Sequence, residues 1–249
     1  MSTGKLFVVG TGPGGVEHIT PAARAAIAGS TVVVGYRTYL DLIPELLAGK
    51  EVVSSEMMKE VERTRQALAR AAAGETVALV CGGDPGIYAL AGLALEVARE
   101  GQIDIDIEVV PGIAAVNGCA ARLGAPLMHD FAAISLSDLL TPWPLIEKRL
   151  AAAAAADFVI VIYNPKSKRR TDQIVRAREI IAEHRRPDTP VGIVTAATRE
   201  QERVVVTNLA LMLEEEIGMQ STVFIGNSTT VTWEKWMITP RGYHHKYDL

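Results

Sequence analysis

Short β-branched runs alternate with longer alanine- and leucine-rich runs along most of this chain of 249 residues. The short runs are almost continuously apolar, which is typical of strands buried on both faces of a parallel sheet. The long runs carry helix start and stop signals, most clearly at Thr20-Pro21 and at Gly29. This alternation predicts an α/β fold, mainly a parallel sheet with covering helices in the N-terminal part.

The pattern locates the individual elements. We expect strands at residues 5–9, 31–34, 76–80, 105–110, 158–162, 191–195, 202–207 and 221–225. We expect helices at residues 21–28, 60–73, 87–99, 170–184 and 209–217. The last two strands, with one helix between them, indicate a mixed sheet in the C-terminal part.

The chain is long enough for two domains. We expect an N-terminal α/β domain with glycine-rich loops over residues 1–118 and a C-terminal α/β domain with a mixed sheet over residues 119–249. Residues 121–144 contain one glycine and three prolines, which is typical of a connection. A cleft between two such domains is the natural ligand site.

Composition excludes several classes of protein. Apolar residues make up 49% and charged residues 22%, so disorder is excluded, and no apolar run is long enough to span a bilayer. The net charge of −4 argues against a nucleic-acid partner. The two cysteines and five scattered histidines form no metal-ligand or disulfide pattern, and the first residues do not resemble a signal peptide. We therefore expect a cytoplasmic protein without a metal.

The first expected strand ends in Gly10-Thr11-Gly12-Pro13-Gly14-Gly15, whose spacing formally fits the dinucleotide signature G-x-G-x-x-G. Three features argue against that function. The next helix starts only at Thr20-Pro21, the second strand is followed by no acidic residue for a ribose hydroxyl, and Pro13 removes a backbone donor. The alternative is a tight turn that packs against its neighbours.

Two further glycine-bearing turns follow strands, at residues 81–88 and 110–115. Asp84 in the second turn is suited to accept hydrogen bonds from a ligand, or to cap a helix with Pro85 at its first position; both roles are compatible. Ligands of open α/β sheets bind outside the carboxyl ends of the strands. The three turns therefore predict a small-molecule site.

Three motifs, in this order and at these intervals, resemble the tetrapyrrole (corrin/porphyrin) methylase family, and the resemblance covers essentially the whole chain. The motifs are Gly10-Thr11-Gly12-Pro13-Gly14, Gly82-Gly83-Asp84-Pro85 and Pro111-Gly112-Ile113-Ala114-Ala115. One departure is Gly15, where many members carry aspartate.

Three later stretches resemble a subgroup that methylates C17 of precorrin-3B in cobalamin (vitamin B12) biosynthesis and contracts the ring to precorrin-4. These stretches are residues 135–143, 163–167 and 237–243, with the sequences Ser-Leu-Ser-Asp-Leu-Leu-Thr-Pro-Trp, Tyr-Asn-Pro-Lys-Ser and Met-Ile-Thr-Pro-Arg-Gly-Tyr. The alternatives are methylation at another ring position, a cobalt-bound substrate, a carrier that binds a tetrapyrrole without turnover, and a nucleotide-dependent oxidoreductase.

The resemblance implies a two-domain fold that binds the methyl donor S-adenosyl-L-methionine, releases S-adenosyl-L-homocysteine, acts on a small-molecule tetrapyrrole and forms a homodimer. By motif match, the donor contacts would be Pro13, Gly82, Gly83, Asp84, Ile87, Ala114 and Ala115, then Tyr163, Asn164, Ala196, Ile225 and Asn227.

The chemistry implied by the resemblance suggests further residues. Methyl transfer from a sulfonium is an in-line displacement that needs alignment and exclusion of water. Ring contraction needs a general base, for which His129, Ser137 and Asp138 are candidates, although each is equally typical of a polar turn or cap.

The substrate carries many carboxylates, so basic side chains should line its site. Arg37, Lys166 and Arg241 lie beside expected strand ends or in loops and are our candidates for this role. The basic run at 166–170 is also typical of a solvated loop.

Overall fold

A computed structural model describes residues 4–248 of the chain, which divides into two compact units, Met1–Ala115 and Val116–Leu249. The boundary we expected at 118/119 falls inside a helix, α5 (Ala115–Leu123), that the sequence analysis did not predict. Within the described part of the chain, no helix is long and apolar enough to cross a membrane.

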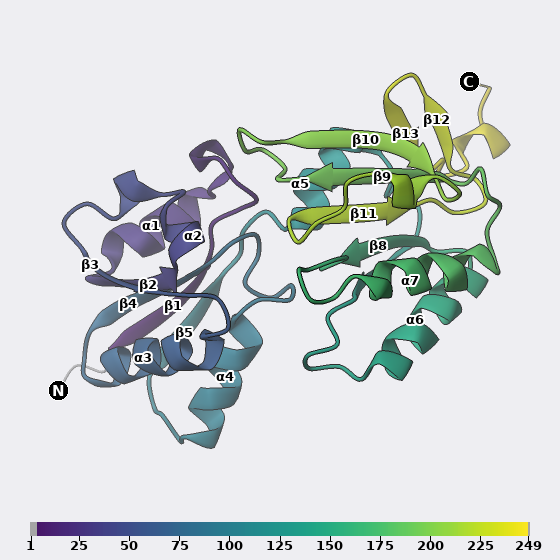
Figure 1. The fold of residues 1–249 in the computed structure, drawn as a ribbon. Coiled ribbons are helices and arrows are strands. Elements are labelled where there is room, and N and C mark those ends of the chain that lie inside the picture. The colour runs from purple at the N-terminus through teal and green to yellow at the C-terminus, as the bar shows by residue number, and fades with distance from the viewer. Residues whose placement is uncertain (1–3, 249) are drawn as a thin grey trace. The chain divides into compact units, whose positions relative to one another are not determined.

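The N-terminal unit contains a five-stranded sheet in the order β3-β2-β4-β1-β5, and all four neighbouring pairs are parallel (Figure 1). Its strands are β1 (Lys5–Gly10), β2 (Val32–Tyr36), β3 (Glu51–Ser55), β4 (Thr76–Cys81) and β5 (Asp106–Val110). Its helices are η1 (Val16–His18), α1 (Pro21–Gly29), α2 (Arg37–Leu40), η2 (Pro44–Leu46), α3 (Glu60–Ala72) and α4 (Ala91–Glu100). The parallel sheet that the apolar strands predicted is confirmed.

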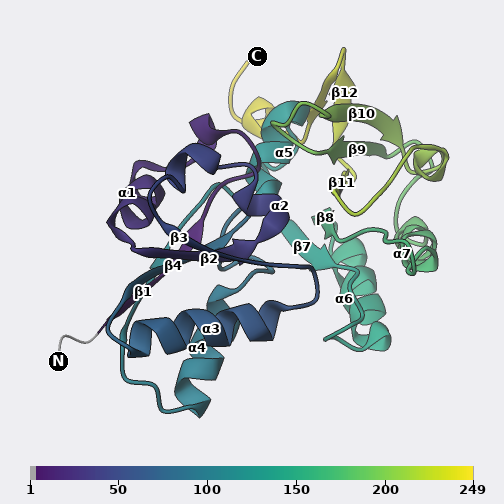
Figure 2. The same cartoon turned by 60° about the vertical axis from the view of Figure 1, so that its left-hand side comes forward.

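Both faces of this sheet are covered. Leu6 and Val8 of β1 point into one core with α3 and α4, while Val9 points into a second core with α1. Figure 2 shows α3 and α4 below the sheet and α1 above it. Thr20 caps α1 as expected, because its hydroxyl accepts a hydrogen bond from the backbone N–H of Ala23 at 3.1 Å.

The strand order gives this unit a topological switch point between β1 and β4. From β1 the chain passes through α1 on one face to reach β2, whereas from β4 it passes through α4 on the other face to reach β5. Connections that leave neighbouring strands on opposite faces open a crevice at the carboxyl ends of those strands. The turns after β1 and β4 are therefore in the position where ligands of such sheets bind.

The C-terminal unit contains a mixed five-stranded sheet in the order β10-β9-β11-β8-β7 and a small sheet in the order β12-β13-β6. The strands are β6 (Gly124–Ala125), β7 (Phe131–Ser135), β8 (Val159–Tyr163), β9 (Pro190–Thr195), β10 (Arg203–Asn208), β11 (Ser221–Ile225), β12 (Val231–Trp233) and β13 (Trp236–Ile238). Only β7 and β8 pair in parallel within the five-stranded sheet. The mixed sheet is thus confirmed.

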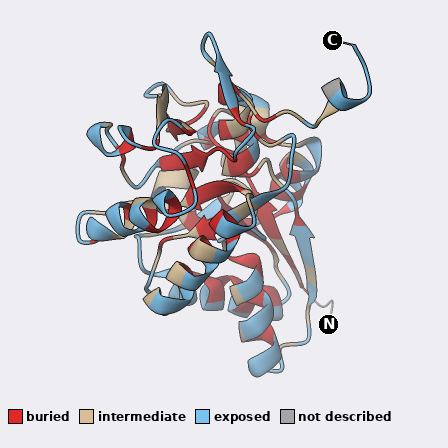
Figure 3. Ribbon diagram, turned by 90° about the vertical axis from the view of Figure 1, so that its right-hand side faces the viewer, coloured by how far each residue is buried: buried red, intermediate tan, exposed pale blue. Residues whose placement is uncertain are grey.

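Helices cover both faces of this second sheet as well. α6 (Trp143–Ala155) and α7 (Asp172–Ala182) pack on one face, and η3 (Met212–Glu214) completes that core. Leu123 of α5 packs against the other face, where a Cβ on Gly192 of β9 would lie 2.5 Å from the leucine side chain. A last turn, η4 (Tyr243–His245), follows the small sheet. Figure 3 shows the buried residues gathered in the strands and on the inner sides of the helices.

Two expected helices differ from the structure. The helix expected at 87–99 begins only at Ala91, because an Asp84 carboxylate oxygen accepts from the Gly86 N–H at 2.8 Å and Tyr88 is left-handed at φ 53°. The helix expected at 209–217 is reduced to η3, because the backbone is extended again at Glu215. In the first segment, the local side-chain bond of Asp84 outcompetes the start of the helix.

The region expected as a connection contains β6 and β7. β7 occupies the edge of the mixed sheet, is exposed at Phe131 and Ala133, and contains a single β-branched residue, Ile134, so it lacks the β-branched run that marked the other strands. The edge strand β3 was missed because four of its five residues are polar or exposed. α6 was missed because its alanine-rich run gives little amphipathic contrast.

Candidate active site

The turns after β1 and β4 are joined by backbone hydrogen bonds. The Gly83 N–H donates to the Gly12 carbonyl at 2.7 Å, and the Gly12 N–H returns a bond to the Gly83 carbonyl at 3.1 Å. Thr11 extends the contact, because its N–H and its hydroxyl both donate to the Cys81 carbonyl. The two glycine motifs therefore form one rigid element at the switch point.

Asp84 attaches the third turn to the other two. One carboxylate oxygen accepts from the Gly86 N–H at 2.8 Å, and the other accepts from the Gly112 N–H at 3.1 Å. Asp84 is therefore not the N-cap of α4, whose N-cap is Leu90. We refer to residues 10–14, 82–87 and 111–115 as the three-turn junction.

Close backbone contact explains why glycines occur in the junction. A Cβ on Gly112 would lie 2.2 Å from the Gly83 carbonyl oxygen, and Gly83 has a φ of +70°, which side chains rarely adopt. Gly82 lies under a ring, since its Cβ would be 2.6 Å from Tyr39. The tight-turn interpretation thus accounts for the glycines by itself, and a ligand would have to bind on the outer surface of the junction.

The junction contains all seven donor contacts that the motifs assigned to the first domain. Pro13 and Ala114 are buried, Gly82, Gly83, Asp84 and Ala115 are partly buried, and Ile87 is 39% exposed. The structure therefore brings these residues together at the carboxyl edge of the sheet, around small residues that leave the backbone accessible.

In the C-terminal unit, a second set of candidates gathers at one edge of the mixed sheet. β7, β8 and β9 run in the same direction, because β7 is parallel to β8 and both β8 and β9 are antiparallel to β11. Their carboxyl ends therefore share one edge, which carries Ser137, Asp138, Tyr163, Asn164 and Ala196. We call this the carboxyl edge of the mixed sheet.

Two residues at this edge have an unusual backbone. Asn164 follows β8 at φ 50°, and Ala196 follows β9 at φ 49°. Asparagine tolerates the left-handed region, but an alanine there is uncommon, and such strain concentrates at functional sites. Both residues were candidates from the sequence, and their strain is a signal that the sequence does not contain.

Hydrogen bonds fix the side chains around β8. The Asn164 amide donates to the Ser135 hydroxyl at 3.0 Å, and the same hydroxyl accepts from the Ser137 N–H at 3.2 Å. The Tyr163 hydroxyl accepts from the Val116 N–H in the first turn of α5 at 2.8 Å. The ends of β7 and β8 and the start of α5 are thus held in one arrangement.

Ile225 and Asn227, also expected to contact the donor, lie at the opposite edge of the sheet. β11 is antiparallel to β8 and β9, so Ile225 pairs with Ile160 and Val191 at the beginning of those strands. Ile225 is fully buried. One ligand at the carboxyl edge cannot reach these two residues across the width of the sheet, so we remove them from the site.

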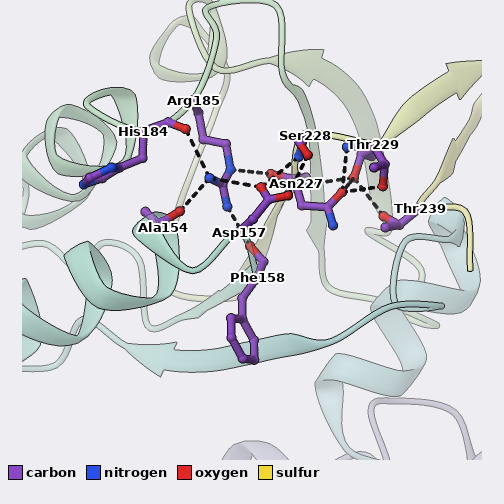
Figure 4. Close-up of polar contacts among 11 residues, drawn as sticks. Ala154, Asp157, Phe158, His184, Arg185, Asn227, Ser228, Thr229 and Thr239 are labelled. Atoms are coloured by element: carbon purple, nitrogen blue, oxygen red, sulfur yellow. Dashed lines mark hydrogen bonds and ion pairs between the residues drawn. The ribbon is translucent and has the colours of Figure 1, made fainter.

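Figure 4 shows what Asn227 does instead. Its side-chain oxygen accepts from the Thr229 N–H at 3.0 Å and from the Thr230 hydroxyl at 3.1 Å. Beside it, Arg185 donates to the Ala154 and Phe158 carbonyls and pairs with Asp157 at 3.2 Å. Asn227 is therefore part of a hydrogen-bond network that stabilises the turn between β11 and β12.

His129 is likewise separated from the other proposed catalytic residues. It precedes β7, whereas Ser137 and Asp138 follow it, so the strand lies between them. His129 is exposed, and its Nδ1 accepts from the neighbouring Asp130 N–H at 2.9 Å. His129 therefore fits the alternative of an ordinary polar turn. Of the three proposed catalytic residues, Ser137 and Asp138 lie at the carboxyl edge of the mixed sheet.

The three proposed substrate-binding cations lie in different places. Arg37 is exposed and follows β2 in the N-terminal unit, Lys166 is half-buried beyond Asn164, and Arg241 is exposed after β13. Within the basic run at 166–170 the structure distinguishes a buried residue, Arg170, from its exposed neighbours. Charge alone gave no reason to single out that arginine.

Burial excludes the two cysteines as nucleophiles at neutral pH. Desolvation raises the pKa of Cys81 and of Cys119 to about 11, so both remain thiols.

Near Ala196, burial alone would raise the pKa of Glu202. Hydrogen bonds from Arg122 at 2.7 Å and from the Thr198 N–H at 2.6 Å outweigh burial and hold that pKa below its ordinary value. Glu202 therefore clamps the turn after β9 as a carboxylate.

Residues 5–212 match the family of Tetrapyrrole (Corrin/Porphyrin) Methylases. Among solved structures, the methyltransferase CobJ superposes with a TM-score of 0.90 at 37% identity, over 95% of this chain and 100% of that one. A uroporphyrin-III C-methyltransferase from Thermus thermophilus, complexed with S-adenyl homocysteine, has a TM-score of 0.70 at 25% identity over 90% of this chain and 97% of that one. The chain belongs to the tetrapyrrole methylases, a methyltransferase family.

Three relatives are similar over nearly the whole chain. A cobalt-factor III methyltransferase of Priestia megaterium is 54% identical over 99% of this chain, which spans only 46% of that relative's length. A probable cobalt-factor III C(17)-methyltransferase of Salmonella typhimurium is 46% identical over 96% of this chain and 99% of its own. A precorrin-3B C(17)-methyltransferase of Sinorhizobium sp is 41% identical over 97% of this chain and 98% of its own. Membership of a methyltransferase family rules against the alternative that the chain is a nucleotide-dependent oxidoreductase.

Proposed function

We propose that this chain transfers a methyl group from S-adenosylmethionine to C17 of a tetrapyrrole precursor of cobalamin. The observation that carries the proposal is the three-turn junction at the switch point of a parallel sheet, in a chain whose relatives are named for methylation at C17. The proposed donor contacts there are Pro13, Gly82, Gly83, Asp84, Ile87, Ala114 and Ala115. Tyr163, Asn164 and Ala196 at the carboxyl edge of the mixed sheet are proposed as further contacts.

The residues of the junction fit such a donor. Gly83 has no side chain and Ala114 and Ala115 have only a methyl group each, so the polar groups of a nucleoside or an amino acid could approach the backbone closely here. Asp84 is a carboxylate whose two oxygens are already oriented by backbone N–H groups, and each oxygen keeps capacity for another donor such as an amine or a ribose hydroxyl.

The donor supplies an activated methyl group on a sulfonium, so the reaction needs no further activation of that carbon. The bond from C17 to the methyl carbon forms as the sulfur–methyl bond breaks, and the sulfur keeps the electron pair. The task of the protein is to hold C17, the methyl carbon and the sulfur in line and to exclude water. A rigid junction suits this task, because a poorly fixed donor loses the benefit of proximity.

We propose the cobalt-bound form, cobalt-factor III, as the substrate, and precorrin-3B as the alternative. The two relatives named for cobalt-factor III are more similar to this chain, at 54% and 46% identity, than the relative named for precorrin-3B, at 41%. The cobalt ion belongs to the substrate in this proposal.

Ring contraction, with release of the meso carbon from the ring, is part of the proposal. It needs a group that accepts a hydroxyl proton. Ser137 and Asp138 are the candidates that remain at the carboxyl edge of the mixed sheet, close to Ser135 and Asn164.

The test is a labelling experiment on the purified full chain. S-adenosylmethionine with a ¹³C-methyl group is incubated anaerobically with cobalt-factor III or with precorrin-3B, and the products are examined by mass spectrometry and ¹³C NMR. The proposal predicts one added methyl group whose protons show a long-range ¹H–¹³C correlation to a quaternary C17. A labelled methyl at another ring position would support a different regiochemistry, and substrate binding without label transfer would support the carrier alternative.

The homodimer implied by the resemblance is a separate part of the proposal. Sedimentation equilibrium of the full chain tests it, with a mass of twice 26.7 kDa as the expected result and a mass of 26.7 kDa as the contradictory one.

A further inference from the structure

Arg170 is a buried arginine whose guanidinium has a nitrogen without a partner in the described part of the chain. The residue is only 9% exposed, whereas Lys168 and Arg169 beside it are exposed. Its Nη1 is buried and has no hydrogen-bond partner among residues 4–248.

This isolation is costly. A buried charged group without an acceptor loses the hydration that it has in water, and nearly all buried polar groups in proteins are paired for that reason. Desolvation lowers the pKa of Arg170, and the more distant charge of Asp138 only partly opposes this effect. The arginine nevertheless remains a cation at neutral pH, so a stable fold would gain from an anion at this position.

The carboxylate of Asp138, whose charge acts on Arg170, is hydrogen-bonded to Gln173. Its carboxylate accepts from the Gln173 amide Nε2 at 2.9 Å, which fixes the orientation of that amide. Gln173 Oε1 is itself buried without a donor. Two buried polar atoms near Asp138 thus lack a partner in the described part of the chain: the donor Nη1 of Arg170 and the acceptor Oε1 of Gln173.

Arg170 is also tied to the carboxyl edge of the mixed sheet. The Ser167 N–H donates to the Arg170 carbonyl at 2.9 Å, and the Arg170 N–H returns a bond to the Ser167 carbonyl at 3.3 Å. Ser167 follows directly on the segment from Tyr163 to Lys166 that carries the candidate site residues. The backbone of Arg170 is therefore held by the loop that continues from the end of β8.

We propose that Arg170 binds a peripheral carboxylate of the tetrapyrrole substrate and that Gln173 and Asp138 position this subsite. The inference rests on the proposed function. A guanidinium binds a carboxylate through two parallel N–H···O bonds, and a cobalamin precursor presents several such groups. The unpartnered Nη1 distinguishes Arg170 from the exposed cations that the sequence suggested.

The test compares three variants of the full chain, Arg170→Gln, Arg170→Lys and, as a matched control, Arg149→Gln at an exposed position of α6. Binding of S-adenosylhomocysteine is measured by calorimetry, binding of cobalt-factor III by absorbance titration in the presence of S-adenosylhomocysteine, and stability by thermal denaturation. Steady-state assays separate KM from kcat.

We expect Arg170→Gln to weaken binding of cobalt-factor III and to raise its KM roughly tenfold to a hundredfold, the loss typical of a charge-assisted hydrogen bond. Binding of S-adenosylhomocysteine should stay within about twofold of wild type, and Tm should be unchanged or higher, because an unpaired buried charge is removed. Arg170→Lys should lie between wild type and Arg170→Gln, and Arg149→Gln should match wild type.

Two results would overturn this inference while leaving the proposed function intact. One is an Arg170→Gln variant that binds cobalt-factor III as wild type does. The other is a variant in which Tm and both affinities fall together, with no recovery in Arg170→Lys, which would show a structural role. The proposed function would instead be overturned if the wild-type chain failed to bind S-adenosylhomocysteine or to methylate either precursor. Measurements on the wild-type chain alone show this, before any variant is compared.

Discussion

Gly112→Ala is the substitution that most directly probes the three-turn junction. The new methyl group would lie 2.2 Å from the Gly83 carbonyl oxygen and 2.7 Å from the Gly10 carbonyl carbon. Both neighbours are backbone atoms, so no change of rotamer can relieve the overlap, and the third turn must move away from the other two. That movement also breaks the bond from the Gly112 N–H to Asp84.

The size of the effect follows from these two contributions. Overpacking in a rigid region costs roughly 1–3 kcal/mol, and a lost hydrogen bond to a charged group costs about 1.5–3 kcal/mol. The free energy of unfolding should therefore fall by roughly 2.5–6 kcal/mol. Affinity for S-adenosylhomocysteine should fall at least tenfold, because the displaced turn carries Ala114 and Ala115.

The measurements are urea denaturation followed by circular dichroism and calorimetric titration with S-adenosylhomocysteine. Gly92→Ala is the matched control, since it adds the same methyl group in α4 with no atom within 4 Å of it. This control should gain roughly 0.5–1 kcal/mol from the better helix propensity of alanine and keep its affinity. A Gly112→Ala variant with the wild-type unfolding midpoint and wild-type affinity would refute the description of the junction.

Three further predictions follow from single contacts. Asp84→Ala should weaken binding of S-adenosylhomocysteine roughly tenfold in calorimetry, because it releases the N–H groups of Gly86 and Gly112; lower stability with unchanged affinity would restrict Asp84 to a structural role. Glu202→Gln should lower the free energy of unfolding at pH 7 by roughly 1–3 kcal/mol. The folded-state pKa of Glu202 lies below its ordinary value of 4.5, so this stabilisation is present above pH 4.5 and is lost as the pH falls through the folded-state pKa. A difference in the free energy of unfolding between variant and wild type that stayed constant from pH 7 to pH 3 in urea titrations would contradict this prediction. Asn227→Ala should lower the thermal midpoint by several degrees through loss of the network in Figure 4 and leave donor affinity unchanged, whereas weakened donor binding with an unchanged midpoint would return Asn227 to the site.

The sequence predicted the sheets better than the helices. β1, β4 and β9 are short apolar runs whose burial on both faces requires no knowledge of their neighbours, and they lie within one residue of the expected bounds. The start of α4 could not be predicted, because it depends on an Asp84 side chain that bonds to Gly86 and Gly112 instead of capping a helix. The hydrogen-bond partners of Asp84 are thus set by the tertiary contact between its own turn and the turn that carries Gly112.

The site shows the same division between local and long-range information. The glycine motifs identified the three-turn junction, since each motif marks the end of a strand of one parallel sheet. The motifs gave no information about strand direction in the mixed sheet, so Ile225 was assigned to a site from which the antiparallel course of β11 excludes it. His129 was misplaced because β7 was not recognised as a strand.

A crystal structure of the full chain with bound S-adenosylhomocysteine tests the central claim most directly. Electron density for the ligand should lie against the backbone of Gly83 and Asp84, within contact of Ala114 and Ala115. Density for the ligand at any position that does not touch the three-turn junction would contradict the account.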